Sequence, residues 1–422
     1  MKPNFVCRIA IASLCLFALG ANAAPDFGQM VKDFSARRHA LAQDLSTRLN
    51  LPLPPEAEAF FQAAATGPWD AVSNAIAALR PQSAQTTHSG LVNELWAPIH
   101  EAWGAWEVWH GWQENSELLA LFYEPVMASM PAGSIYFGGT DSGRFVITAA
   151  NELRDPPPVL CLTQNALADN TYMAHLRAVC GDRIWLPSEQ DMNASFKQFV
   201  DDVKAGRILA GADIKIEDGR VRVQGVGGVM QINALLARMI FDRNKDTHPL
   251  FIEESYVLAW MAPYLEPHGP ILKLNPEPLE TLPRESIDRD TQFWAEQEKT
   301  LMATPGFAEN YAARKSFSKL RAAIAGVYEY RKLYPEAEAA YRQASRLCPT
   351  APETHLRLAQ MLADQQRRDD AIRVLEDFIA ADPAEGADSA KEFRSNLRKA
   401  KQPNETDKEQ TPRFSGSPAI ET

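Results

Sequence analysis

Apolar and polar residues follow two different periods along this chain, and the changes of period divide it into parts. From residue 24 to about 130, apolar residues recur at helical spacing. Between residues 131 and 276, short apolar runs alternate with helix-length segments, and from 285 to 399 the helical period returns. The pattern therefore predicts a fold of the α/β plus all-α class. We expect an N-terminal helical segment, an αβ domain and a C-terminal helical region.

The N-terminal segment contains helices that prolines and glycines separate. We expect helices at Phe27–Leu49 and Trp69–Leu79, with one between them that ends at Gly67 and Pro68. A further helix carries five tryptophans at spacings of seven, three, three and three, which places most of the rings on one broad face: Trp96, Trp103, Trp106, Trp109 and Trp112. A tryptophan stripe can be a carbohydrate platform, but at helical spacing it more often belongs to the core. We predict core.

The middle part reads as β-α-β-α-β, which is typical of a Rossmann-like, mostly parallel sheet. The apolar runs are short, rich in β-branched or aromatic residues, and bounded by Gly, Pro or Asp. We expect strands at 135–137, 159–163, 184–186, Leu250–Ile252 and Ile271–Leu274. Residues 214–224 predict a hairpin that turns at Asp218 and Gly219, and residues 255–265 predict a helix.

A glycine-rich loop ends the first of these strands, where ligands usually bind in open α/β sheets. Its glycines expose backbone N–H groups at a helix start, which can hold an anion beside Arg144. Helix capping by Thr140, Asp141 and Ser142 is the other interpretation, and the two are compatible. More polar residues follow the later strands. The candidate ligand-binding residues are Gly138, Gly139, Thr140, Asp141, Ser142, Arg144, Gln164, Asn165, Asp169, Glu253 and Glu254.

No catalytic motif is complete. A nucleophile elbow at Ser142 would need glycines where Thr140 and Arg144 stand. A Ser-Asp-His order with Asp246 and either His248 or His268 stays open. The His100-Glu101 pair lacks the second histidine of a zincin, and the loop lacks both the P-loop lysine and the three-glycine dinucleotide fingerprint. We therefore predict no catalytic residue, no metal and no cofactor.

The C-terminal region contains an internal repeat of 34 residues. Ala325, Ala337, Tyr341 and Pro349 recur as Ala359, Ala371, Leu375 and Pro383. Small residues allow paired helices to approach, the larger one fills the groove, and the proline ends each unit. The period and residue types resemble the tetratricopeptide repeat, although Phe378 stands where Ala344 predicts a small residue. We expect flanking helices at 314–325 and 389–399 to cap two repeats, and residues 400–422 to form a disordered tail.

The N-terminal segment and the net charge indicate where the protein is located and which partners it can have. Lys2 and Arg8, an apolar stretch and Ala21-Asn22-Ala23 predict a signal peptide over residues 1–23, with an uncleaved anchor as the alternative. No other apolar run reaches the ~20 residues of a membrane span, so we expect a periplasmic or secreted protein. Cleavage changes the net charge from −11 to −13, with 41 basic against 54 acidic residues, and an acidic chain disfavours nucleic acid as a partner.

Three cysteines remain after cleavage, which is an odd number and excludes a framework built only of disulfides. Cys161 and Cys180 are placed to bridge a strand and the following helix, but buried free thiols are equally consistent with the sequence.

Four segments carry a family resemblance: residues 133–144, Leu162 to Asp169, Phe251 to Tyr256 and Pro263 to Gly269. Through them the chain resembles exported tetratricopeptide proteins of verrucomicrobial type. Residues ~130–385 are similar to the extracytoplasmic tail of the protein O-mannosyltransferase-like membrane family. In that family glycosyl transfer belongs to a multi-span membrane portion, so the resemblance implies no transferase activity for these segments and maps no catalytic residue.

These observations favour an exported, non-catalytic interaction protein. Its repeats and αβ domain would bind a protein partner or an envelope glycan. The alternative is an enzyme or binding protein for a glycosyl or phosphorylated ligand at the loop 138–144.

Overall fold

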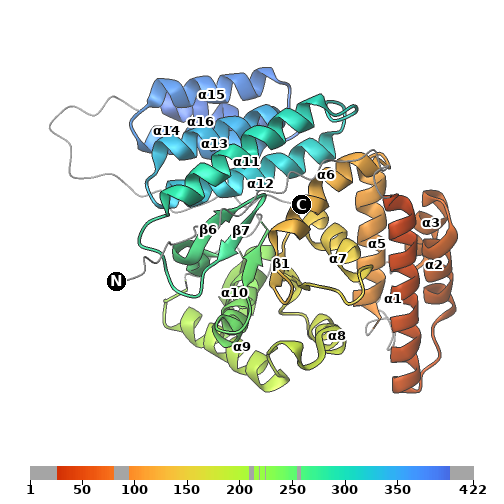
Figure 1. Ribbon diagram of the computed structural model, residues 1–422. Helices are drawn as coiled ribbons and strands as arrows, with labels where there is room; N and C mark the ends of the chain where they lie inside the picture. Colours follow the sequence, from red (N-terminus) through yellow and green to blue (C-terminus); the bar gives the residue numbers. More distant parts are fainter. Residues whose placement is uncertain are drawn as a thin grey trace, which may run out of the picture.

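The computed structural model describes residues 26–79, 95–208, 213–217, 219–223, 225–253 and 258–399, without the side chain of Val226. The predicted signal peptide, the predicted tail, the turn residue Asp218 and the candidate site residue Glu254 lie outside these ranges. Figure 1 shows the N-terminal helices beside a small sheet and the C-terminal helices packed over it. No helix of the described part is long and apolar enough to cross a membrane.

The N-terminal helices begin and end where polar caps and prolines interrupt the apolar period. At the start of the first helix, the side chain of Asp26 accepts backbone N–H groups of the first turn. At its end stands the cap residue Asn50, whose φ of 50° is the left-handed conformation typical of a helix terminus. Two of the expected helices have the predicted bounds. The helices are α1 (Phe27–Leu49), α2 (Pro55–Thr66), α3 (Trp69–Leu79), α5 (Trp96–Gly111) and α6 (Ser116–Ser129).

The tryptophans of this region belong mainly to the core, as predicted. Trp103, Trp106, Trp109 and Trp112 are all buried. The indole N–H of Trp106 donates to the carbonyl of Ala64 in α2 at 3.0 Å, so its polar atom is satisfied inside the protein. These four rings therefore hold helices together and do not form an exposed carbohydrate platform, whereas Trp96, at the start of the helix, is only half-buried.

The sheet is mixed, with five strands in the order β2-β1-β5-β7-β6. β1 pairs in parallel with both β2 and β5, whereas β7 runs antiparallel to β5 and β6. The sequence predicted a mostly parallel sheet, and this holds only for β2, β1 and β5, because both pairings of β7 are antiparallel. The strands are β1 (Ile135–Gly138), β2 (Leu160–Thr163), β5 (Leu250–Ile252), β6 (Leu265–His268) and β7 (Ile271–Leu274).

One strand prediction and one helix prediction in the αβ domain are wrong. Residues 184–186 form no strand, because the side chain of Asn244 binds both backbone groups of Trp185, at 2.9 and 3.0 Å, in place of a neighbouring strand. The predicted helix at 255–265 contains, in its described part, only the 3₁₀ helix η4 (Ala259–Tyr264), and Leu265 begins β6. β6 is an edge strand, where Pro267 is tolerated without its N–H.

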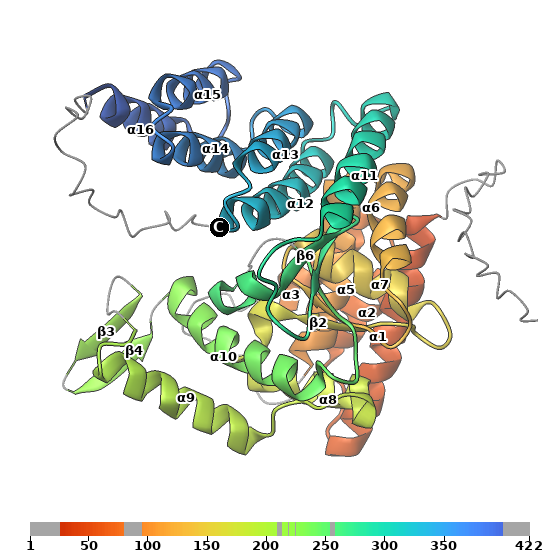
Figure 2. The same cartoon turned by 60° about the vertical axis from the view of Figure 1, so that its left-hand side comes forward.

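The connections between parallel strands carry helices, as the sequence predicted. After β1 come the short π-helix η1 (Ser142–Val146) and α7 (Ile147–Glu152). The longer connection from β2 to β5 includes a hairpin that projects at one end of the molecule (Figure 2). Its elements are η2 (Gln164–Ala166), α8 (Asn170–Cys180), η3 (Gly181–Arg183), α9 (Glu189–Lys204), β3 (Ile214–Glu217), β4 (Arg220–Val223) and α10 (Val226–Asn244).

Six helices follow the sheet, and short connections join them, as is typical of antiparallel neighbours (Figure 2). All the small and filling residues of the 34-residue repeat are buried: Ala325, Ala337, Tyr341, Ala359, Ala371 and Leu375. The departure at Phe378 has a local reason, since its ring stacks on His355 at 4.9 Å. The helices are α11 (Arg284–Ala303), α12 (Tyr311–Tyr330), α13 (Tyr334–Leu347), α14 (Pro352–Asp364), α15 (Arg368–Ala380) and α16 (Ala387–Lys399).

The C-terminal helices are docked directly on the antiparallel edge of the sheet. α12 contacts β6 and β7, and α11 contacts β6. Arg331, which follows α12, donates to the carbonyls of Ala262 at 3.2 Å and Pro263 at 3.1 Å. The docked helices are thus held by packing and by hydrogen bonds to the segment before β6.

Candidate functional site

The loop after β1 closes around a carboxylate of the protein itself. Glu253, which follows β5, is 1 % exposed and accepts the backbone N–H groups of Gly139 and Thr140, each at 2.8 Å. The hydroxyl of Thr140 donates to the same carboxylate. From β1 the chain continues to β2 on one side, while β5 lies on the other side of β1. The gap between β1 and β5 is therefore the topological switch point, where open α/β sheets usually hold a ligand. Here the anion position is taken by Glu253.

The shape of the loop depends on Gly143. A Cβ built on Gly143 would lie 1.9 Å from the carboxyl carbon of Glu253, closer than real Cβ contacts permit. Its N–H donates to the Thr140 hydroxyl at 2.9 Å, and its carbonyl accepts the hydroxyl of Tyr136 at 3.0 Å. The absence of a side chain at Gly143 is what allows the carboxylate to reach the loop.

Burial raises the pKa of Glu253, and the hydrogen bonds from Thr140 and Gly139 oppose this rise only in part. The more distant charge of Lys319 in α12 also lowers the pKa. A carboxyl that holds a loop together from inside the fold is a structural group. Its three donors belong to Gly139 and Thr140, which the sequence predicted as ligand-binding residues.

The ion pair, ring contact and hydrogen bond of Arg144 are with residues other than Glu253. Its guanidinium pairs with Asp141 at 2.5 Å, lies over the ring of Phe145, and donates to the side-chain oxygen of Asn165 at 3.4 Å. The structure therefore brings together Asp141, Arg144 and Asn165 from the loops after β1 and β2.

The hydrolase arrangement that the sequence left open is not assembled. Ser142 is buried, and its hydroxyl lies 3.3 Å from that of Ser316 in α12. His248 binds the carbonyl of Gly133 and His268 that of Ser129, each at 2.8 Å, and both carbonyls precede β1. The histidines thus lie at the amino end of β1, whereas Ser142 follows its carboxyl end.

The segment after β2 is held by an asparagine that sequence reasoning missed. Asn233 of α10 is fully buried; it accepts the N–H of Ala168 at 2.7 Å and donates to the carbonyl of Asn165 at 2.9 Å. Asp169 caps α8 through the N–H groups of Thr171 and Tyr172. The only signal in the sequence was a polar residue among the apolar residues that recur at helical spacing between Gly228 and Phe241.

Replacing Asn233 with alanine should therefore destabilise the αβ domain. The change leaves the N–H of Ala168 and the carbonyl of Asn165 without their present partner, at a cost of ~1–3 kcal/mol for each group that stays buried. Thermal unfolding of Asn233→Ala and of Asn193→Ala, an exposed asparagine of α9, would measure the difference. Equal melting temperatures for the two variants would contradict the role given to Asn233.

A cavity of about 610 Å³ lies beside this segment, between the start of α5, the loop after β2, and helices α8, α9 and α10. Asn165 and Asp169, two of the predicted site residues, line it. Gln164, predicted with them, is instead buried in the fold at 1 % exposure.

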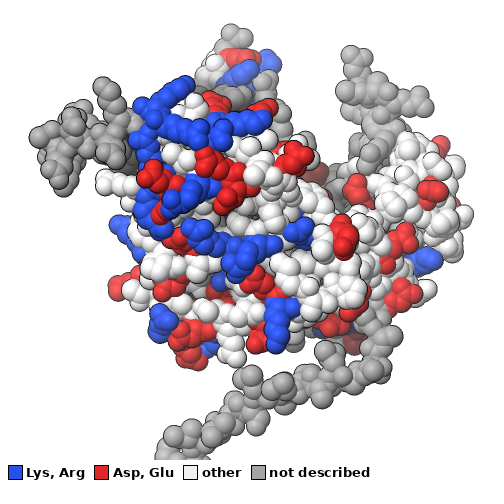
Figure 3. Space-filling view, turned by 90° about the horizontal axis from the view of Figure 1, so that it is seen from above, with Lys and Arg blue, Asp and Glu red and all other residues white. Residues whose placement is uncertain are grey.

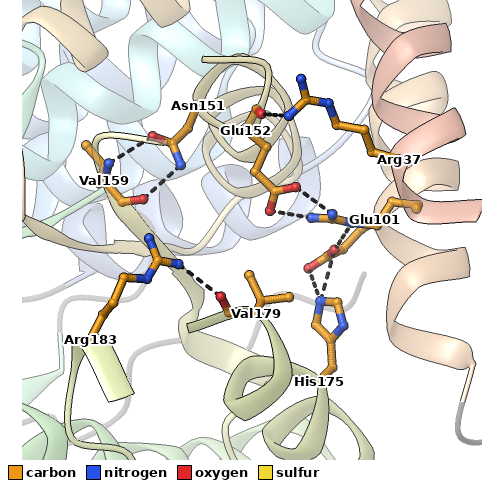
Figure 4. Close-up of polar contacts among 9 residues, drawn as sticks. Arg37, Glu101, Asn151, Glu152, Val159, His175, Val179 and Arg183 are labelled. Carbon is orange, nitrogen blue, oxygen red and sulfur yellow. Dashed lines mark hydrogen bonds and ion pairs between the residues drawn. The ribbon is translucent and has the colours of Figure 1, made fainter. Parts of the chain in front are cut away.

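A second polar cluster, also missed from the sequence, joins α1, α5, α7 and α8 (Figure 4). Arg38, 3 % exposed, binds Glu101 at 2.5 Å and Glu152 through both terminal nitrogens at 2.5 and 2.6 Å. His175 lies 3.1 Å from the Glu101 carboxylate. Burial opposes ionisation of Glu101, but Arg38 and His175 outweigh it and hold its pKa at about 2.

The thiols near this cluster are free. Cys161 is half-buried and Cys180 is buried, and burial raises the pKa of Cys180 to about 11. A thiol with so high a pKa is a poor nucleophile at neutral pH. Among the described residues, no group of three His, Cys, Asp or Glu is arranged to hold a metal ion.

In comparisons with known proteins, no family model matches the chain, and no curated protein or solved structure is significantly similar to it. The geometry described above is therefore the basis for assigning a function. That geometry comprises a loop bound to its own glutamate, a lined cavity beside it, and a docked set of C-terminal helices.

Proposed function

We propose that this protein is an exported, non-catalytic interaction protein of the tetratricopeptide type. In this proposal its C-terminal helices bind a protein partner and its Rossmann-like αβ domain binds an envelope glycan. The arrangement of α12–α16 is the observation that carries it. The small residues of the repeat are buried in the packing of these helices, and exposed arginines such as Arg342 and Arg346 lie on their outer surface.

The charge of these helices differs in sign from that of the whole chain. Residues 311–399 contain 16 Lys and Arg against 13 Asp and Glu, a net charge of +3, whereas the full chain has −11. Figure 3 shows basic side chains gathered over one part of the face seen from above, with acidic ones among them. This asymmetry favours a partner segment that is acidic.

A groove of about 310 Å³ between α13, α14 and α15 offers such a segment both charge and apolar surface. Arg342 and Arg346 lie on its rim with side chains 47 % and 57 % exposed, and Leu358 and Val374 line it. The two arginines pair with Glu338 and Glu298. The two glutamates are only 19 % exposed, so the exposed guanidinium groups can bind a partner carboxylate in addition to them.

The alternative function, binding or turnover of a glycosyl or phosphorylated ligand at the loop 138–144, has less support. The N–H groups of Gly139 and Thr140 already donate to Glu253, and Arg144 is paired with Asp141. An anionic ligand at this loop would have to displace a buried carboxylate.

Site-specific photo-crosslinking in the producing cells tests the proposal. A photoreactive amino acid at position 373 of α15, beside the groove, should give one defined crosslinked partner in the envelope or the medium. The double variant Arg342→Glu/Arg346→Glu should reduce that product at least about tenfold, because two favourable contacts become repulsive.

Two controls make the outcome decisive. The photoreactive residue at position 48 of α1, where the native arginine is 51 % exposed, should not give the same product. N-terminal sequencing of the exported fraction should find Ala24 first. A full-length cytoplasmic protein would contradict export, and identical crosslinks from positions 48 and 373 would contradict binding by the helices.

A further inference from the structure

The cavity beside the segment after β2 combines aromatic side chains with amides and one carboxylate. It holds about 610 Å³, within the range of small-ligand sites. Asn165 and Asp169 line it from the loop after β2, and Asn193 from α9. These groups offer amide donors and oxygen acceptors at the carboxyl end of a parallel strand, where ligands of α/β folds bind.

Aromatic and aliphatic side chains form other parts of the wall. Trp96 and His100 lie nearly parallel, at an angle of 15°, with ring centres 6.1 Å apart. Phe196 of α9 and Val229 of α10 also line the cavity, and they are 47 % and 40 % exposed. Large apolar side chains that remain exposed beside a cavity indicate a binding surface more than a core.

Charge selects the class of ligand. None of the described residues that line the cavity is a lysine or arginine, and Asp169 is a carboxylate. A phosphate or carboxylate ligand would therefore meet no permanently positive side chain in the described wall, where His100 is the one titratable base, and it would meet one repulsive carboxylate. A purely apolar ligand would offer no acceptor to the amide N–H groups of Asn165 and Asn193, and covering polar groups without hydrogen bonds costs free energy.

The polar wall is held in position by the fold. Asn233 binds both Ala168 and the carbonyl of Asn165, and Asp169 is fixed by its hydrogen bonds to the start of α8. Arg144 contacts the Asn165 side chain from the other side. Groups ordered in this way lose little entropy when a ligand binds.

From these observations we infer that the cavity binds a neutral saccharide. Sugar rings would lie against the aromatic side chains, and Asn165, Asp169 and Asn193 would bind their hydroxyls. The inference rests on the proposed function, since it locates the glycan site of the αβ domain and limits its ligand to uncharged sugars. It assigns the site to this cavity and not to the loop 138–144.

A printed array of neutral and acidic oligosaccharides, incubated with the purified mature chain, tests the inference. The chain should bind neutral members and not acidic ones. Phe196→Ala and Asn193→Ala, both at exposed positions of α9, should each raise the dissociation constant for the best neutral glycan at least about tenfold. Tyr330→Ala removes an aromatic ring of 55 % exposure outside the cavity and should leave binding unchanged.

Several outcomes would overturn the inference. They are retention on acidic glycans only, no retention on any neutral glycan, or equal binding by Phe196→Ala and the parent. Binding of dodecanol in place of glycans, lost in Phe196→Ala, would assign the cavity to an apolar ligand. The crosslinked product from position 373 should persist in Phe196→Ala, so failure of the saccharide site and failure of partner binding are distinguishable.

Discussion

Gly143→Ala is expected to destabilise this protein by about 3 kcal/mol or more, because a buried carboxylate occupies the space of the new methyl group. That carboxylate is the end of a flexible side chain, which would normally move aside. Here Glu253 is held by three donors and is 1 % exposed. Displacing it leaves a charge and two N–H groups inside the fold without their partners.

Thermal and denaturant unfolding would measure this effect, with Gly111→Ala as the matched control. Nothing lies within 4 Å of a Cβ at Gly111, the last residue of α5, so the control should differ from the parent by about 1 kcal/mol at most. The double variant Gly143→Ala/Glu253→Ala should show strong coupling between the two changes. A Gly143→Ala protein as stable as the parent would show that Glu253 does not bind the loop.

Arg38→Ala is expected to have a comparable effect, a loss of ~3–5 kcal/mol, because it leaves the buried carboxylate of Glu101 and the half-buried one of Glu152 without their shared cation. Arg48→Ala on the same helix removes an arginine that is 51 % exposed and paired with Asp44, which is 63 % exposed. That control should change the free energy of unfolding by less than ~1 kcal/mol. Similar losses in both variants would contradict the buried ion-pair cluster.

The acid dependence of stability gives a second measurement of the same cluster. The pKa of Glu101 is about 2 in the folded protein against an ordinary 4.5. The stabilisation linked to this shift is therefore fully present above pH 4.5, and it is lost as the pH falls from there to about 2. In Arg38→Ala the decline of stability over this window should be smaller than in the parent.

The sequence predicts those elements whose limits are marked locally. The bounds of α1 and α3 follow from Asp26, Asn50 and the prolines and glycine between the helices, and β5 and β7 from short apolar runs between polar residues. At 184–186 the same kind of run misleads, because the partner of Trp185 is the side chain of Asn244, 59 residues away. No local pattern contains that partner.

The candidate site was predictable as a set of segments but not as a set of contacts. The sequence predicts the loop after β1 and the polar residues after β2 as parts of the site. The hydrogen bonds of Glu253 to the loop span 114 residues, and those between Arg38 and Glu101 span 63. Arg38 and Asn233 had one signal in common, since each is a polar residue on the buried side of a helix. Their partners are set by tertiary packing.

The docking of the C-terminal helices on β6 and β7 has a consequence for avidity. Because Arg331 and the packing of α11 and α12 join the two parts without a free linker, the groove at α13–α15 and the cavity at α10 keep a fixed spacing. A partner that carries both an acidic segment and a glycan would gain a high effective concentration for its second contact only if its own spacing matched. The protein would then select partners by the distance between their acidic segment and their glycan.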